Sequence, residues 1–239
     1  MAEGSSAGAR AAAAGVWRSR TCAELEAAAR FSRLAEQLAA AGAVAPVVAM
    51  ARAAAEDERR HAALCAALAR ELGGATFTPP AVAGAPEVAP RALGTRERLL
   101  YEVVAMSCVT ETLSAALLGE MVERATDPRV RDTMQQILRD EVDHARLGWA
   151  HLAAEWQRGC ADVIGQHLPA MLAGTVHEEV FSSGAEHPEQ GALSGLGALG
   201  RGERRRIFDE TMRLVVLPGL RRFGIDTGRG EQWLAERLG

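Results

Sequence analysis

Aromatic residues are scarce in this chain: they make up 4 % of its 239 residues, and only one of them is a tyrosine. The apolar fraction is still 48 % and rests mainly on alanine and leucine, which favour closely packed helices. Alternating β-branched segments, which mark half-buried strands, are essentially absent. A chain of this length can form one domain with a substantial core, so these features predict an all-α fold.

Basic excess and long apolar runs are also missing. The formal charge is −4, which gives no electrostatic footprint for nucleic acid or an anionic membrane surface. No apolar run reaches the roughly 20 residues that span a bilayer. The N-terminus lacks the basic start of a signal peptide, and residues 1–17 are predicted to be a flexible tail.

Cysteine pairs are absent as well. Cys22, Cys65, Cys108 and Cys160 lie far apart and form no CxxC motif. This argues against a thiolate zinc site and, in a chain of this size, indicates a reduced, cytoplasmic protein.

Proline and glycine divide the chain clearly. Helices are predicted at about 18–41, 46–72, 95–125 and 128–156, with Gly42 and the pair Asp127-Pro128 at the two short turns. Residues 75–93 contain four prolines and no periodicity, which predicts a long crossing loop. Two helical hairpins joined by a long connection have the layout of a four-helix bundle over residues 18–158.

The remaining residues, 159–239, are predicted to pack on the bundle as part of the same domain. Residues 161–182 are expected to be helical with a kink at Pro169, and residues 183–202 to be a glycine-rich loop. Helices near 203–216 and 230–238 would close the chain. The ERRR run at 203–206 is interpreted as a solvated basic turn at a helix start.

Two Glu-x-x-His pairs carry the functional signal: Glu58 with His61, and Glu141 with His144. Residues three apart on a helix lie about 60° from each other, so each pair projects to one side. A single pair of this kind is more often part of a solvated face. Two copies on corresponding helices favour a shared site.

Each pair has a carboxylate partner at matching depth in its hairpin. Glu58 follows Pro46 by 12 residues, and Glu24 lies at a similar level on the apolar stripe of the preceding helix. Glu141 follows Pro128 by 13 residues, and Glu111 precedes Ala125 by 14. Four carboxylates and two imidazoles in a core would be very costly as bare charges, whereas two divalent cations would neutralise them. This donor set suits iron or manganese.

The pattern Glu, Glu-x-x-His, Glu, Glu-x-x-His resembles the ferritin-like diiron carboxylate superfamily. The stretches RAAAEDERRHAALC, SCVTETLSAA and DPRVRDTMQQILRDEVDHARLGW look most similar to bacterial ferritin-like proteins of undefined activity. The resemblance implies a ferritin-like bundle with two iron ions, or a manganese–iron pair. It assigns one metal to Glu24, Glu58 and His61 and the other to Glu111, Glu141 and His144, with Glu58 and Glu141 as bridging candidates.

The same resemblance gives a role to the aspartate before each pair. In oxygen-activating members, similar aspartates accept a hydrogen bond from a metal-bound histidine of the opposing helix. This pairs Asp140 with His61 and Asp57 with His144; solvated aspartates are the alternative. Arg60 either supports Asp140 or faces water.

Several other residues leave two interpretations open. Cys65 and Cys108 either line a pocket or pack in the core. His177, Glu178 and Glu179 either cap the site or form an exposed polar face.

Three functions compete on this basis. The favoured one is an oxidase or monooxygenase that uses dioxygen, a small organic substrate and an electron-donor protein or reductase, possibly as a homodimer. Iron oxidation and storage, or rubrerythrin-like peroxide reduction, is the alternative, although the position one turn before Glu111 is Cys108 rather than a further carboxylate. A non-catalytic helical module would leave six aligned ligands unexplained.

Overall fold

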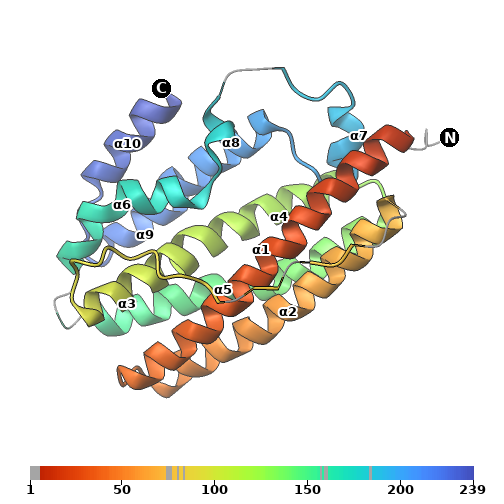
Figure 1. Ribbon diagram of the computed structural model, residues 1–239. Coiled ribbons are helices and arrows are strands. Elements are labelled where there is room, and N and C mark those ends of the chain that lie inside the picture. Colours follow the sequence, from red (N-terminus) through yellow and green to blue (C-terminus); the bar gives the residue numbers. More distant parts are fainter. Residues whose placement is uncertain are drawn as a thin grey trace.

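The computed structural model describes residues 6–73, 77–79, 81–82, 84–156, 158, 161–182 and 185–239, without the side chains of residues 161 and 162. Within these residues all regular elements are helices, in agreement with the predicted all-α class. Four long helical segments form the bundle: α1 (Ala7–Ala40), α2 (Ala45–Gly73), the stretch from α3 (Thr95–Val103) through η1 (Val104–Glu111) to α4 (Thr112–Arg124), and α5 (Pro128–Trp156). Figure 1 shows these segments running side by side.

The hairpin turns form at the glycine and proline residues that predicted them. Helix α1 ends before Gly42, whose φ of 69° is accessible to glycine at little cost. Pro46 lies in the first turn of α2, and Pro128 is the first residue of α5. The Asp127 carboxylate accepts a hydrogen bond from the Arg129 N–H at 2.9 Å, which caps α5.

The crossing connection between the hairpins is fixed to the bundle by one buried carboxylate. Glu102 on α3 accepts hydrogen bonds from the backbone N–H groups of Val88 and Ala89 and pairs with Arg33 of α1 at 2.7 Å. Arg33 also donates to the Ala85 carbonyl. The predicted loop is therefore held against α1 and α3.

The N-terminal prediction is wrong for residues 7–17, because α1 begins at Ala7. The Ser6 hydroxyl caps the helix by accepting a hydrogen bond from the Ala9 N–H at 3.0 Å. Trp17 is fully buried and donates its indole N–H to the Leu196 carbonyl at 2.9 Å. Packing against the C-terminal part orders the segment that the sequence presents as a tail; residues 1–5 lie outside the described residues.

The C-terminal part packs along the α3–η1–α4 segment of the bundle, and its elements differ in detail from the predicted ones (Figure 1). It consists of α6 (Ala161–Thr175), η2 (Glu178–Phe181), α7 (Gln190–Gly195), α8 (Arg201–Thr211), η3 (Met212–Val216), α9 (Leu217–Arg221) and α10 (Gly228–Leu238). Helix α7 lies within the predicted glycine-rich loop, where buried Leu193 and Leu196 supply an apolar face. Phe181, Phe208 and Trp233 pack ring against ring and join η2, α8 and α10.

The ERRR run is also more than a solvated turn. Arg204 pairs with Glu179 at 3.0 Å, and Arg206 pairs with Glu120 of α4 at 3.2 Å. These ion pairs tie α8 to η2 and to the bundle.

One stretch of the bundle, Thr95–Arg124, is long and apolar enough by composition to cross a membrane, but 56 % of its most apolar window is buried inside the protein. It carries the buried carboxylates Glu102 and Glu111. Its burial is that of a core helix in a helical bundle.

Two apolar clusters form the core and leave a polar layer between them. One contains Phe31, Leu34 and Leu38 of α1 with Val47 and Ala51 of α2. The other joins the start of α1 and the end of α2 to the second hairpin and the C-terminal helices. The buried carboxylates and histidines lie between these clusters.

Candidate metal centre

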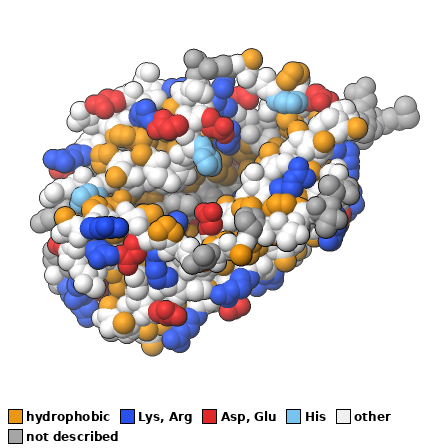
Figure 2. Space-filling model, viewed as in Figure 1, with side chains coloured by type: hydrophobic (Ala, Val, Ile, Leu, Met, Phe, Trp, Pro, Cys, Tyr) orange, Lys and Arg blue, Asp and Glu red, His pale blue; other side chains and the backbone are white. Residues whose placement is uncertain are grey.

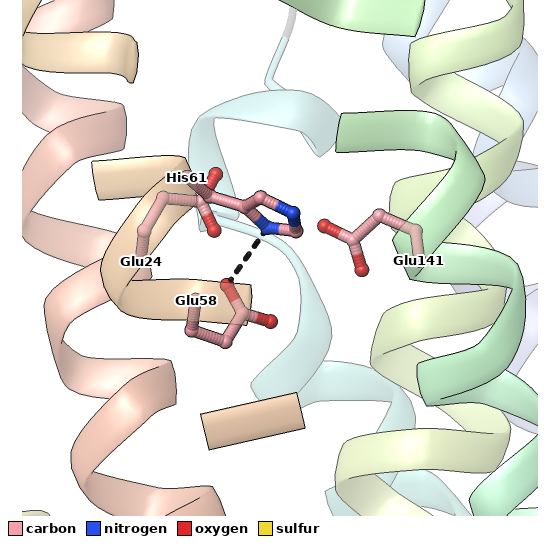
Figure 3. A group of neighbouring side chains, drawn as sticks. All are labelled: Glu24, Glu58, His61 and Glu141. Atoms are coloured by element: carbon pink, nitrogen blue, oxygen red, sulfur yellow. Dashed lines mark ion pairs between the residues drawn. The ribbon is translucent and has the colours of Figure 1, made fainter. Parts of the chain in front are cut away.

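Four helical segments bring the six predicted ligands together in this polar layer. Glu24 comes from α1, Glu58 and His61 come from α2, and Glu141 comes from α5 (Figure 3). Glu111 ends η1, and His144 lies one turn beyond Glu141. All six side chains are buried, with exposed fractions between 0 % and 7 %. Their ligand atoms form two overlapping groups: Glu24, Glu58, His61 and Glu141, and Glu58, Glu111, Glu141 and His144.

The overlap of the two groups places Glu58 and Glu141 at the centre of the arrangement. Within each group, one ligand atom per residue lies within 4.8 Å of all the others. Two neighbouring cations would therefore share these two carboxylates, which are the residues expected to bridge. Glu24 and His61 would complete the ligand set of one ion, and Glu111 and His144 would complete that of the other.

The two imidazoles present the same nitrogen to the cluster. Nδ1 of His61 lies 3.3 Å from a Glu58 oxygen. Nδ1 of His144 lies 3.0 Å from the other Glu58 oxygen and 3.4 Å from Glu141. The ring centroids are 5.7 Å apart, so both rings face one small volume.

The opposite ring nitrogens contact the two aspartates, in the pairing expected from the sequence. Nε2 of His61 lies 3.0 Å from Asp140, and Nε2 of His144 lies 3.4 Å from Asp57. Arg60 joins the two aspartates, with contacts of 2.8 Å to Asp57 and 2.7 Å to Asp140. An aspartate at Nε2 favours the tautomer with its proton there, which leaves Nδ1 free as a metal ligand.

The atoms that face one another have no hydrogen-bond partner. They are both carboxylate oxygens of Glu58, Oε2 of Glu141, and Nδ1 of His61 and His144, and all are buried. Buried polar atoms are rarely left unsatisfied, and these are all acceptors when the carboxylates are ionised and the rings are neutral. A set of oxygen and nitrogen acceptors around a common point fits two divalent cations of the iron or manganese type.

The protein electrostatics show what this cluster costs without cations. Burial, followed by repulsion from Glu58, raises the pKa of Glu24 well above its ordinary value. Burial and the charge of Glu141 do the same to the pKa of Glu111. Burial opposes ionisation of Glu58, but contacts with His144 and His61 outweigh it and lower its pKa to about 2. Burial lowers the pKa of His144, but contacts with Glu141 and Glu58 raise it to about 10.

A π-helical segment sets the position of Glu111. The predicted continuous helix is interrupted by η1, Val104–Glu111, in which backbone hydrogen bonds join residues five apart instead of four. The segment meets α5 at Gly148, where an added Cβ would lie 2.7 Å from the Ser107 Cβ and 2.8 Å from Cys108 Sγ. This close approach brings Glu111 beside Glu141.

A cavity of about 910 Å³ opens beside the cluster. It lies between α1 and the η1–α4 segment, and η2 and α8 border its mouth; Figure 2 shows the corresponding hollow in the molecular surface. All four cluster carboxylates, Glu24, Glu58, Glu111 and Glu141, belong to its lining. The rest of the lining combines small or apolar side chains, among them Ala23, Ala27, Met106, Leu117 and Met121, with the polar side chains of Arg20, Arg30, Thr110 and Ser114.

The sequence left two interpretations open for the buried cysteines and for the group His177, Glu178 and Glu179, and the structure places the cysteines in the core and the group at the cavity. Cys65 and Cys108 are fully buried in the core, outside the cavity lining, and burial raises the pKa of both thiols far above the ordinary value. His177, Glu178 and Glu179 are exposed and line the outer part of the cavity. They border its mouth rather than cap the metal ligands. Cys160 lies outside the described residues.

Two contacts to the cluster were missed from the sequence. Arg20 pairs with Glu24 at 3.1 Å, and the Ser114 hydroxyl donates to Glu141 at 3.3 Å. Arg20 precedes Glu24 by four residues, a spacing that places two side chains side by side on a helix. Ser114 follows Glu111 by one turn, and its reach to Glu141 depends on the packing of two helices.

The bundle and its carboxylate–histidine cluster are those of a ferritin-like protein of the diiron class. Residues 21–150 match the model of the rubrerythrin family, and the chain belongs to that family. Among curated proteins, none matches this sequence. One similar solved structure is "Protein 19 with aldehyde deformylating oxidase activity from Synechococcus", which is 17 % identical with a TM-score of 0.59. The match covers 95 % of this chain and 97 % of that one, and it shows a shared fold.

Proposed function

We propose that this protein is a dinuclear iron enzyme that uses dioxygen to oxidise a small organic substrate. The observation that carries the proposal is the cavity that reaches all four cluster carboxylates. When bound, the two iron ions would supply the redox chemistry for dioxygen activation. In a hydroxylation, one oxygen atom enters a C–H bond and the other leaves as water, with two electrons and two protons from a donor.

The chain's own residues would hold the cations and control access to them. Glu58 and Glu141 would bridge the ions, Glu24 and Glu111 would bind one ion each, and Nδ1 of His61 and His144 would complete the set. Asp140 and Asp57 would retain the proton on the far nitrogen of each ring. The apolar lining near Leu117 and Met121 would exclude water from the reacting volume.

The electrons would come from a separate donor, because the described residues hold no second candidate metal cluster. We propose a reductase or electron-transfer protein as this partner and the cytoplasm as the compartment. We also propose that the protein forms a homodimer.

Peroxide reduction or iron oxidation is the second candidate, and the rubrerythrin family match favours it. Hydrogen peroxide and iron ions are small, so neither reaction needs an apolar cavity of this volume. Use of the cavity therefore separates the two candidates.

The separating experiment fills the cavity without changing a ligand. Leu117→Trp adds bulk to the lining, and Leu214→Trp is a matched control at a residue that is 73 % exposed elsewhere. The iron-loaded, chemically reduced proteins are given dioxygen with a panel of organic compounds, or hydrogen peroxide alone. We expect oxidised organic product from the wild type and the control, and at least a tenfold loss in Leu117→Trp.

A different result would favour peroxide reduction or iron oxidation, the second candidate function. If no compound is oxidised while all three proteins consume hydrogen peroxide at equal rates, the oxygenase proposal is wrong. Equal metal content in the three proteins is the check that the cluster is intact.

A further inference from the structure

The cavity beside the cluster is a slot with two parallel walls. Its wall on α1 consists of Val16, Arg20, Ala23, Ala27 and Arg30, which follow one another at steps of four and three residues. Such steps form a continuous stripe on a helix. The facing wall consists of Met106, Thr110, Ser114, Leu117 and Met121.

Two arginines of the α1 wall each contact a methionine of the facing wall. Arg20 contacts the Met121 sulfur at 3.4 Å, and Arg30 contacts the Met106 sulfur at 3.8 Å. Ten residues of helix separate the two arginines, about 15 Å at 1.5 Å per residue. Between them the α1 wall contains Ala23 and Ala27, whose small side chains leave room for a ligand, together with Glu24 and Glu26.

The two arginines differ in what balances their charge. Arg20 pairs with Glu24 at 3.1 Å. For Arg30, the structure shows no carboxylate within ion-pair distance among the described residues, and its buried Nε has no hydrogen-bond acceptor. A buried donor without an acceptor is destabilising. A ligand that enters the slot could supply the acceptor that Arg30 lacks.

The other charged groups of the slot do not fill this role. Glu178 pairs with Arg237, and Glu179 pairs with Arg204 at 3.0 Å. Glu26 lies one turn before Arg30 but is exposed and not paired with it. Among the arginines of the described slot residues, Arg30 is therefore the one with no carboxylate within ion-pair distance.

We propose that the slot binds an organic acid, with its carboxylate on Arg30 and its apolar chain along Ala27 and Ala23. This deepens the proposed function, because it names the substrate class of the same site. Six residues separate Glu24 from Arg30, about 9 Å of helix rise. A carboxylate at Arg30 therefore lies away from the cluster, and a carbon several bonds along the chain lies beside Glu24 and Glu111. Arginine can bind the carboxylate through two parallel hydrogen bonds.

Three probes with the same carbon chain test this: octanoate, octan-1-ol and octylamine. Their dissociation constants are measured by calorimetry on the metal-loaded protein without dioxygen or reductant, so that no turnover occurs. We expect wild type to bind octanoate at least tenfold more tightly than octan-1-ol, equal to about 1.4 kcal/mol. Octylamine should bind most weakly.

Variants at Arg30, with a control variant at Arg18, then test whether Arg30 causes the preference for octanoate. Arg30→Gln should reduce it below about threefold while the affinity for octan-1-ol changes less than twofold. Arg30→Lys should keep part of the preference, because the charge remains but the fork geometry is lost. Arg18→Gln, on the same helix outside the slot, should behave as wild type. Melting curves of all variants check that the bundle is folded.

Several results would overturn the inference. They are no binding of any probe, a preference for octan-1-ol or octylamine, or a wild-type octanoate preference in Arg30→Gln. The last result would place the carboxylate on the metals or on Arg20. Because binding is measured without turnover, these failures are distinct from a failure of the dioxygen chemistry, which the oxygen-dependent product assay tests.

Discussion

At the scale of single residues, each histidine of the cluster has a different neighbour on each ring nitrogen. Nδ1 faces the carboxylates, and Nε2 faces an aspartate of the opposing helix. His61 and His144 therefore link the inner cluster to the half-buried pair Asp57 and Asp140. This arrangement separates residues that would bind metal from residues that would tune it, and variants can address each set alone.

The first prediction concerns the ligands themselves. Purified protein should contain close to two first-row transition metal ions per chain. Glu58→Ala should lose one or both ions because this carboxylate belongs to both ligand groups, and His144→Ala should lose at least one. Asp143→Ala is the control, since Asp143 lies next to His144 but points to solvent. Elemental analysis after dialysis measures the result; full occupancy in both ligand variants would refute the assignment.

The second prediction concerns the aspartates. Asp140→Ala and Asp57→Ala leave all six ligands in place, and loss of such a partner costs roughly 10- to 100-fold in metal affinity or activity, about 1.4 to 2.7 kcal/mol. The effect should be larger for Asp140, whose contact of 3.0 Å is shorter than the 3.4 Å contact of Asp57. Asp→Asn should be milder, because the amide is a neutral and weaker acceptor.

Chelator competition and stopped-flow oxidation of the reduced protein measure these two effects. Asp143→Ala again serves as the control, with an expected change within about 0.5 kcal/mol. Wild-type affinity and oxidation rate in both Asp→Ala proteins would show that the aspartates do not act on the histidines.

At the scale of elements, the sequence predicts the hairpins well because helix periodicity, Pro46, Pro128 and Gly42 act locally. The same stripes place Glu24 and Glu111 in the core, and both are buried. Their burial was thus predictable from spacing, whereas their assignment as metal ligands rests on the family resemblance. The π-helical segment η1 was not predictable in this way, because Val104–Glu111 has the composition of an ordinary buried helix. The start of α1 and helix α7 were missed since tertiary packing, as at Trp17, orders them.

The third prediction tests the contact that positions η1. Gly148→Ala would place a Cβ 2.7 Å from the Ser107 Cβ and 2.8 Å from the Cys108 N and Sγ atoms. Overpacking of this kind costs about 1 to 3 kcal/mol, and the shift should also move Glu111 and weaken metal binding. Gly119→Ala in α4 is the control, because its added Cβ meets nothing within 4 Å. It should be neutral or stabilising by up to about 1 kcal/mol.

Denaturant melts and metal titrations of the two glycine variants provide the comparison. If Gly148→Ala is as stable as Gly119→Ala and binds metal equally well, the close approach of α5 and η1 does not hold Glu111 in place.

At the scale of the whole molecule, burying the cluster makes folding depend on metal and on pH. In the metal-free protein, the pKa values of Glu24 and Glu111 are raised, and that of His144 is raised to about 10. Groups with raised pKa values bind more protons in the folded than in the unfolded state. Their contribution to stability is complete below their ordinary pKa values and is lost as the pH rises through the folded ones.

The fourth prediction follows from this sign. The melting temperature of metal-free protein should rise as the pH falls from 8 to 5. Below the ordinary carboxylate pKa of 4.5 it should fall again, because the pKa of Glu58 is lowered to about 2 and its contribution is lost on protonation. Metal-loaded protein should be more stable at pH 8 and lack the rise. Calorimetric melts across this range test the prediction, and a flat profile for the metal-free protein would contradict it.

The position of the slot also determines the side from which a ligand in it would approach the cluster. The slot lining contains the cluster carboxylates but neither imidazole, while Asp57, Asp140 and Arg60 meet at the seam between α2 and α5. The cavity and the Asp57–Asp140–Arg60 group therefore lie on different sides of the cluster. Under the proposed function, an organic substrate would occupy the cavity while a donor of electrons or protons would act from the α2–α5 side, so that neither would block the other.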